Sequence, residues 1–287
     1  MLPLLFALVA QPAPPKDIFA PDNLVAWCIV PFDKKNRTPA ERVEMLGKLG
    51  FKRFAYDWRG PHLPTFDEEV RLLKARGIEL SAVWFPANLG AESQKLLDVI
   101  RKHGVKTQLW VTMGDPGGAD QAAKITAAAK VIRPLAEEAA KLQCSVGLYN
   151  HGSWFGEPEN QIALIEHLKL KNVGIVYNLH HGHDHLGRMP ALLKSMTPHL
   201  LAFNLNGMVA GGERVGKKIL PIGEGHFDAE LLKGLRDSGY TGPVGILGHT
   251  DDDAAERLAD NLDGLAWLKA RLDGKDAGPK PKWRTWK

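Results

Sequence analysis

The chain repeats one pattern eight times, and this alternation restricts its possible folds more than any other feature. Each repeat has a short run rich in β-branched or aromatic residues, then a polar junction, then a stretch with apolar residues at helical spacing. The predicted strands are residues 24–31, 53–58, 80–85, 107–112, 145–150, 174–178, 201–206 and 244–248. The predicted helices are residues 38–49, 65–75, 93–102, 119–141, 159–168, 188–195, 228–237 and 252–271. This order predicts an α/β fold, a single (β/α)8 TIM barrel over residues 23–272.

Local signals at the ends of the elements agree with this fold. Thr38-Pro39 is a typical start for a helix, and glycines follow four of the predicted helices, at Gly50, Gly77, Gly104 and Gly239. The competing architecture is an open doubly wound sheet, which usually carries a glycine-rich phosphate-binding turn after its first strand. Residues 27–33 contain no glycine, so we favour the closed barrel.

Charge is concentrated at the C-terminal end of the chain. The formal net charge is +4, and the predicted tail at 273–287 carries five basic and two acidic side chains. The rest of the chain is therefore close to neutral. Because a nucleic-acid groove needs a concentrated basic field, we expect no nucleic-acid partner. We expect this tail either to pack its tryptophans on the barrel or to stay mobile.

The first 22 residues form a leader that is set apart from the repeats. Residues 1–10 are apolar and are followed by a proline-rich stretch at 11–16, which resembles the hydrophobic region of a signal peptide. We therefore expect an exported protein, periplasmic or extracellular. The alternative is a cytoplasmic enzyme with an apolar leader. The run is too short for a stable membrane span, which needs about 20 residues.

Histidines mark where chemistry is expected. Eight of the eleven lie where predicted strands end and loops begin. These are His62, His151, His180, His181, His183, His185, His226 and His249. In a (β/α)8 barrel these junctions share one face, which holds the active site. Histidine titrates near neutrality and binds metals, so its enrichment there predicts a catalytic or metal-binding site.

Aromatic, amide and charged residues at the same junctions suggest a carbohydrate as the small-molecule partner, because rings stack on sugar C–H faces and amides bind hydroxyls. The predicted substrate-binding residues are Trp27, Asp57, Arg59, Trp84, Trp110, Tyr149, Asn150, Asn178, His180, Asn204 and Asn206. For the three tryptophans, the alternative is that they fill or cap the barrel core.

The predicted catalytic residues are His151, His181, Glu224, His226 and His249. Glu224 and His226 are separated by one residue and could form an acid/base pair, and Asp228 is expected to cap the next helix. His183 and His185 lie farther from the strand end than His180 and His181, so we expect them in a solvated loop.

Several stretches of the chain resemble the xylose isomerase-like TIM-barrel superfamily, which includes sugar phosphate isomerases, epimerases and AP endonucleases. They are residues 148–152, 173–181, 201–207, 220–228 and 238–243. The resemblance covers residues 23–272 and implies action on a sugar. It also implies one divalent metal, bound by a Glu, an Asp, a His and a Glu on strands five to eight, and a strand-six histidine that corresponds to His181.

The metal-binding residues of that superfamily are replaced in this sequence. The corresponding positions hold Tyr149, Asn178, Asn204 and Leu247. Hard cations prefer anionic oxygen ligands, so we expect no Mn²⁺ or Mg²⁺ there. Any metal would be a borderline ion such as zinc, bound by His151, His181, His226 and His249.

Two functions are compatible with this altered site. The first is an isomerase, epimerase or lyase that removes a proton next to a sugar carbonyl, with imidazole or Glu224 as the base. The second is a carbohydrate-binding barrel that no longer catalyses a reaction. The number of histidines on one face favours the enzyme, because a pure binder has no need of groups that titrate at neutrality.

Overall fold

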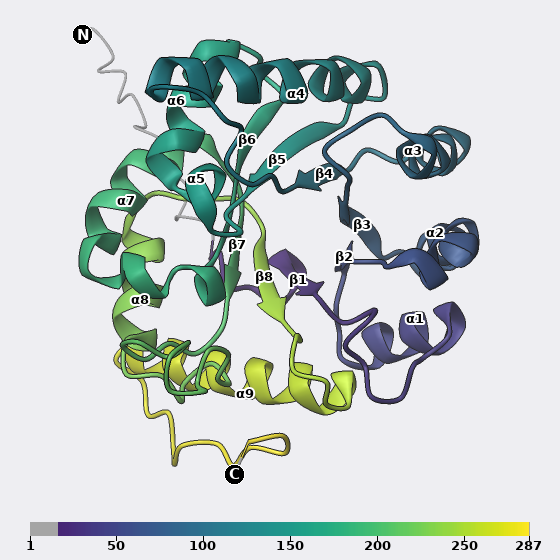
Figure 1. Ribbon diagram of the computed structural model, residues 1–287. Helices are drawn as coiled ribbons and strands as arrows, with labels where there is room; N and C mark the ends of the chain where they lie inside the picture. The colour runs from purple at the N-terminus through teal and green to yellow at the C-terminus, as the bar shows by residue number, and fades with distance from the viewer. Residues whose placement is uncertain (1–16, 287) are drawn as a thin grey trace, which may run out of the picture.

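The computed structural model describes residues 17–286, and its eight strands close into a parallel barrel in sequence order (Figure 1). β1 pairs with β2 on one side and with β8 on the other. The strands are β1 Leu24–Trp27, β2 Arg53–Tyr56, β3 Glu79–Trp84, β4 Gln108–Val111, β5 Ser145–Tyr149, β6 Val173–Asn178, β7 Leu200–Leu205 and β8 Val244–Leu247. The predicted (β/α)8 fold is thereby confirmed.

Helices surround the barrel as the alternation predicts (Figure 1). They are α1 Pro39–Lys48, α2 Phe66–Arg76, α3 Ala91–His103, α4 Gln121–Lys141, α5 Ser153–Gly156, α6 Pro158–Leu168, α7 Met189–Met196, α8 Asp228–Asp237 and α9 Ala254–Leu272. Thr38 caps α1 through a reciprocal bond with Glu41, and Gly77 and Gly104 end α2 and α3 in the left-handed conformation.

The structure differs from the prediction at the end of β1. The expected strand reached residue 31, but pairing stops at Trp27 because Cys28 has a φ of 63°. A left-handed residue turns the chain away from the ladder. The following segment instead bonds to the next strand end, where the Val30 N–H donates to the Asp57 carboxylate over 3.0 Å.

Two layers of apolar side chains build the core. The outer layer lies between the strands and the helices. The inner layer fills the barrel and includes Trp27, Trp110, Tyr149 and Leu247, all of them buried. Aromatic rings therefore form the floor on which any site at the barrel mouth must rest.

Residues 1–22 and 273–287 were predicted to lie outside the barrel. The predicted signal peptide falls mostly on residues 1–16, outside the described residues. At the other end, Trp283 packs beside Gly264 of α9, so this part of the tail lies on the barrel. Within residues 17–286, none of the helices combines the length and the apolar character that crossing a membrane requires.

We predict that Gly147→Ala destabilises the protein by about 1–3 kcal/mol through overpacking. A Cβ at Gly147 would lie 2.5 Å from Val176 Cγ2 and 2.8 Å from Trp110 Cδ1. Gly187→Ala is the matched control, because no heavy atom lies within 4 Å of its Cβ position. Urea denaturation checks the pair, and equal free energies of unfolding would contradict the packing argument.

Candidate functional site

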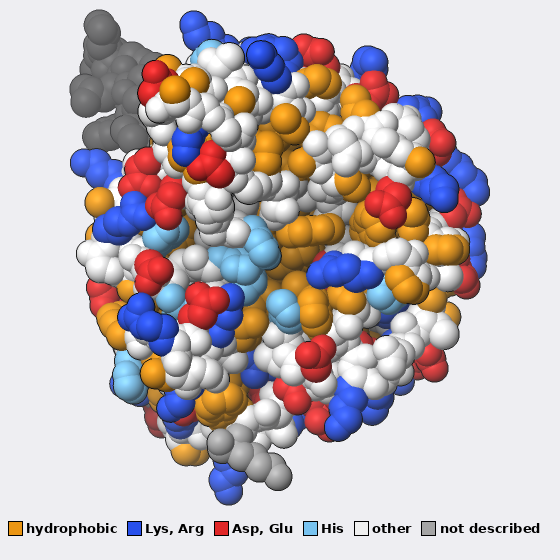
Figure 2. Space-filling model, viewed as in Figure 1, with side chains coloured by type: hydrophobic (Ala, Val, Ile, Leu, Met, Phe, Trp, Pro, Cys, Tyr) orange, Lys and Arg blue, Asp and Glu red, His pale blue; other side chains and the backbone are white. Residues whose placement is uncertain are grey.

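A cavity of about 580 Å³ lies at the barrel mouth, beyond the C-terminal ends of the strands. Figure 2 shows histidine side chains gathered near the centre of this face. The lining residues are His151, Gly152, Ser153, Gly156, Glu157, His180, His181, Asp184, His185, Glu213, Lys218, Ile219 and His249. Three of the predicted catalytic histidines, His151, His181 and His249, therefore share one cavity with the predicted binding residue His180.

Four imidazoles form a continuous row, which we call the histidine row: His151, His181, His180 and His249. Successive ring centroids are 4.4, 3.8 and 6.0 Å apart. His151 follows β5 and His249 follows β8, while a 3-10 turn at Leu179–His181 presents the middle two directly after β6. This turn was not predicted, and it is what places two consecutive histidines in one cavity.

The histidine row is held in the neutral form. Burial lowers the pKa of His181 to about 3 and that of His249 to about 4, and it lowers the pKa of His180 well below its usual value. Burial also lowers the pKa of the more exposed His151. The nearby Lys218 cation lowers all four pKa values further. At neutral pH each ring therefore offers one N–H donor and one lone pair.

Lys218 is the site residue that the sequence reasoning missed. It lies with Glu213 in the loop between β7 and α8, and their side chains form an ion pair of 2.6 Å. No motif marks this position. The only available signal was its place in a loop after a strand, because all such loops in a barrel face the mouth.

Three predicted binding residues, Asn150, Asn178 and Asn204, form a buried chain of amides at the ends of β5, β6 and β7. Asn204 Nδ2 donates to Asn178 Oδ1 over 2.6 Å, and Asn178 Nδ2 donates to Asn150 Oδ1 over 3.3 Å. Asn150 also bonds the Asn178 backbone through both of its side-chain atoms. These amides tie three strand ends together below the histidine row.

The three tryptophans that were predicted to bind substrate lie in two places, inside the barrel and beside the cavity. Trp27 and Trp110 are each 1% exposed inside the barrel, and Trp110 Nε1 donates to Gln108 Oε1 over 2.8 Å. This placement matches the alternative in which they fill the core. Trp84 is only partly buried, and its ring centroid lies 6.4 Å from that of His151. Trp84 is therefore the tryptophan best placed to contact a ligand.

The positions that correspond to the superfamily metal site do not fit a metal. Burial raises the pKa of Tyr149 well above its usual value, which keeps the phenol neutral. Asn178 and Asn204 use their amides on each other, and Leu247 is hydrocarbon. Among residues 17–286, no three His, Cys, Asp or Glu side chains are arranged to hold a metal ion. The residues present thus lack the anionic oxygens that hard cations need.

Asp57 and Arg59 lie on the side of the mouth formed by β2. Asp57 is buried, and burial raises the pKa of its carboxyl group. Arg59 is exposed, and its Nη1 donates to the Asp57 and Trp58 carbonyls. The guanidinium lies 5.4 Å from the ring of Phe32, which in turn stacks on His249 at 3.6 Å. Arg59 therefore lies beside the ring that packs on His249, but neither Asp57 nor Arg59 is among the lining residues of the cavity.

Glu224 and His226 lie outside the lining of the cavity. Glu224 Oε2 accepts a hydrogen bond of 2.9 Å from Trp283 Nε1 and pairs with Lys280 at 2.6 Å. His226 is exposed. The prediction that Asp228 caps the next helix is wrong, because the N-cap of α8 is Phe227 and the Asp228 carboxylate accepts instead from the backbone N–H groups of Met208, Gly223 and Gly225 in the preceding loop.

The expectation of a solvated loop for His183 and His185 is wrong. His183 is 8% exposed and His185 is 5% exposed. The ring nitrogens of His183 lie 3.3 Å from the Val209 carbonyl and 3.0 Å from the Lys218 carbonyl. His185 Nδ1 is 2.8 Å from the Tyr177 hydroxyl. The 3-10 turn at His183–Arg188 folds these rings inward, and sequence spacing alone did not indicate it.

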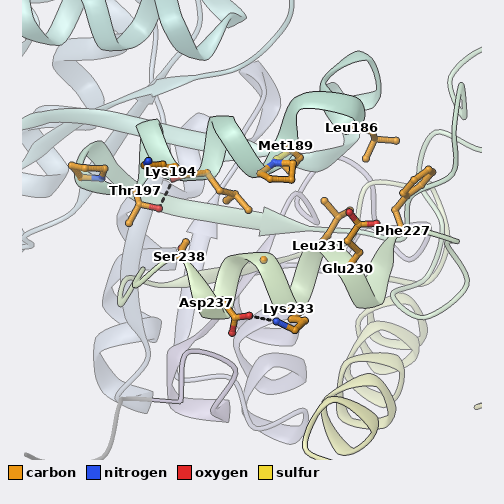
Figure 3. A pocket seen from close by; sticks show the side chains of 14 residues that line it. Leu186, Met189, Lys194, Thr197, Phe227, Glu230, Leu231, Lys233, Asp237 and Ser238 are labelled. Carbon is orange, nitrogen blue, oxygen red and sulfur yellow. Dashed lines mark hydrogen bonds and ion pairs between the residues drawn. The ribbon is translucent and has the colours of Figure 1, made fainter.

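Figure 3 shows a second hollow, between α7 and α8 on the outside of the barrel. Its volume is about 540 Å³, and apolar side chains such as Met189, Leu193 and Leu231 line it. It shares none of its lining residues with the mouth cavity. We therefore place the candidate site at the mouth, where titratable groups converge.

The fold and the mouth cavity define a (β/α)8 barrel protein with a site at the C-terminal ends of its strands. A family profile described as "Xylose isomerase-like TIM barrel" matches residues 43–271. The protein therefore belongs to the xylose isomerase-like TIM barrel family. No curated protein matches the sequence.

Solved structures with the same fold include 3-keto-D-glucoside 4-epimerase YcjR from E. coli, with a TM-score of 0.65 and 16% identity over 87% of this chain and 99% of that one. The IOLI protein with a bound zinc atom has a TM-score of 0.69 and 14% identity, with coverage of 87% and 99%. The probable 3-DHS dehydratase AsbF from Bacillus anthracis has a TM-score of 0.61 and 15% identity, with coverage of 80% and 93%. At these identities, the likeness shows the fold.

The depressed histidine pKa values predict a loss of stability in acid. A group whose folded pKa lies below its unfolded value near 6.5 binds more protons when unfolded, so stability falls as the pH drops below 6.5. For His181 this range ends at its pKa in the folded protein, which is about 3. Each such group contributes a slope of about 1.4 kcal/mol per pH unit between its two pKa values.

His181→Gln should therefore reduce the fall in unfolding free energy between pH 6.5 and 4.5, measured by urea denaturation. His167→Gln is the control, because His167 is exposed on α6 and should leave the slope unchanged. An unaltered slope in His181→Gln would show that this imidazole is not held neutral by burial.

We further predict that the protein retains no stoichiometric Mn²⁺ or Mg²⁺ after incubation with either ion and desalting. The physical reason is that Tyr149, Asn178 and Leu247 offer no anionic oxygen. Elemental analysis provides the measurement. One retained equivalent of either ion per chain would contradict this account of the site.

Proposed function

We propose that the protein is a sugar isomerase or epimerase-like enzyme that moves a proton next to the carbonyl of a carbohydrate or keto-sugar. The observation that carries this proposal is the histidine row. Four neutral imidazoles and one lysine line a single cavity at the barrel mouth. Such groups can remove a proton from carbon and stabilise the negative charge that develops on oxygen.

His151 is the best candidate for the base. It is the most exposed member of the row, so a substrate carbon could reach it. Its lowered pKa leaves the ring nitrogen unprotonated at neutral pH. In the first step the C–H bond breaks and the proton bonds to the His151 nitrogen. The electron pair of the C–H bond forms the new C=C bond, and the π electrons of the carbonyl group move onto its oxygen.

His181 and Lys218 are the groups we assign to that oxygen. With a pKa of about 3, His181 is a weak base but a neutral N–H donor, and such an imidazole can polarise a carbonyl without giving up a full proton. The Lys218 ammonium adds a positive charge on the same cavity wall. Together they would lower the energy of the enolate.

His249 stands at the far end of the histidine row from His151. Return of the proton to the opposite face, as in epimerisation, requires a donor other than the base that removed it, or a turned substrate. We assign that role to His249. Ser153 lines the cavity and Trp84 lies beside His151, so we assign them to the sugar hydroxyls and the sugar ring. Glu224 and His226 have no part in this scheme.

Some solved structures of the same fold support a sugar as substrate, because they include 3-keto-D-glucoside 4-epimerase and D-psicose 3-epimerase. The competing function is a carbohydrate-binding barrel without turnover. One observation favours it, namely that a pKa of about 3 for His181 leaves little basicity in the middle of the row.

Exchange of deuterium from solvent into a bound sugar distinguishes these two functions. The protein is screened by thermal shift against sugars, keto-sugars and sugar phosphates, and each hit is incubated in D2O and followed by NMR. The proposal predicts deuterium at the carbon next to the carbonyl. An exported protein would meet mainly neutral sugars, whereas a cytoplasmic protein would also meet sugar phosphates. Both kinds of compound therefore belong in the screen.

His151→Ala should lower this exchange by at least about 100-fold, as expected for loss of a general base. Lys218→Gln should lower it while the sugar still binds. His167→Gln is the control for an exposed histidine far from the mouth. Sugar binding with no exchange in the wild type would establish the binding protein instead, and full exchange in His151→Ala would remove His151 from the mechanism.

A further inference from the structure

Lys218 belongs to a long segment that has little regular structure of its own. Between β7 and α8 the chain runs through residues 206–227, which contain one isolated β-bridge, between Gly207 and Leu220, and short turns closed by backbone hydrogen bonds. We call this segment the β7–α8 loop. A long loop does not hold a side chain in one place unless contacts from outside fix its backbone.

Two buried side chains from different elements fix consecutive carbonyls of this loop. His183 Nε2 lies 3.0 Å from the Lys218 carbonyl, and Arg257 Nη2 donates to the Ile219 carbonyl over 3.3 Å. Arg257 is on α9 and is only 1% exposed. Buried arginines usually pair their donors, and here Nη2 holds the residue after Lys218, while Nε has no partner among the described residues.

Arg257 also contacts the C-terminal tail. Its Nη1 donates to Thr285 Oγ1 over 3.4 Å, and Thr285 in turn donates to Asp260 from its hydroxyl and from its N–H, each over 2.8 Å. Arg284 adds a backbone bond of 2.9 Å to the same carboxylate. The Asp260 side chain is fully buried, so this part of the tail is fixed to α9.

A second contact joins the tail directly to the β7–α8 loop. Trp283 Nε1 and Lys280 Nζ both reach Glu224 Oε2. The loop backbone also approaches α9 closely, because a Cβ at Gly264 would lie 1.7 Å from the Ile222 carbonyl oxygen and 3.1 Å from the Trp283 ring. Only glycine leaves room for the loop and the tryptophan at this point of α9.

We propose that Arg257 and the tail residues 279–286 are positioning elements for Lys218, which hold the β7–α8 loop over the histidine row. The side chain that faces the cavity is thus fixed partly by the last residues of the chain. This inference rests on the proposed function only for what Lys218 does there. The positioning itself is a property of the folded protein without substrate.

The physical consequence is preorganisation. If the loop is already ordered, binding a ligand at the mouth does not have to restrict it, and less binding free energy is lost to ordering. If the tail contacts are removed, the loop should sample open conformations while the barrel strands stay closed, because stability is not uniform across a structure.

Hydrogen exchange measured by mass spectrometry on the full chain tests this. The double variant Trp283→Phe with Thr285→Val keeps an aromatic ring and a β-branched side chain but loses the Trp283 Nε1 bond to Glu224 and the Thr285 hydroxyl bonds with Arg257 and Asp260. We expect amide exchange in residues 209–223 to become about 10-fold faster, with unchanged exchange in β4, β5 and β6. Lys275→Gln is the control, because Lys275 pairs only with Asp273 near the start of the tail.

Acetylation of lysines by a water-soluble, amine-reactive reagent gives a second readout at Lys218 itself. In the double variant and in Arg257→Met, Lys218 should react several-fold faster than in the wild type, relative to the exposed Lys194. Arg257→Lys keeps a donor and should restore part of the protection. Neither readout uses substrate, so failure of the proposed reaction would leave this result unaffected.

The proposal is overturned if residues 280–286 exchange faster in the double variant while the loop and Lys218 stay as protected as in the wild type. It is also overturned if strands and loop lose protection together, since the tail would then act on the whole fold and not on the site.

Discussion

The amide chain across β5, β6 and β7 is the interaction on which the candidate site depends. Asn178 and Asn204 hold two of the strand-end positions that correspond to metal ligands in the superfamily, and Asn150 bonds to Asn178 from the end of β5. Buried carboxylates at such positions would be costly to desolvate. Neutral amides can instead donate and accept in turn, as the bonds of 2.6 and 3.3 Å show. These hydrogen bonds tie the three strand ends together.

The histidine row follows from this floor. The imidazoles lie against one another and against the aromatic rings of Tyr149 and Trp84. Such surroundings favour the neutral ring, which is why the pKa values of His181 and His249 fall so far. In the proposed function, this site acts through hydrogen bonds from neutral imidazoles and through the positive charge of Lys218.

Much of this arrangement could be predicted from the sequence, and the exceptions have physical reasons. Strand periodicity and helix caps located all eight β/α units, and the barrel then required residues such as His151 and His249 to share a face. Local backbone turns were not predictable. The 3-10 turns after β6 bury His183 and His185, although the sequence there is polar. Lys218 was not predicted because its position depends on distant contacts such as the bond from Arg257 to the carbonyl of the next residue, Ile219, 38 residues earlier along the chain.

The place of Trp283 and Thr285 after all eight strands in the sequence has a consequence for how the protein matures. Translation proceeds from the N-terminus, so the strands leave the ribosome before these two residues do. A nascent chain could close its barrel and still lack the contacts that fix the β7–α8 loop. A premature stop codon near residue 280 would then yield a folded barrel in which this loop is not held over the cavity.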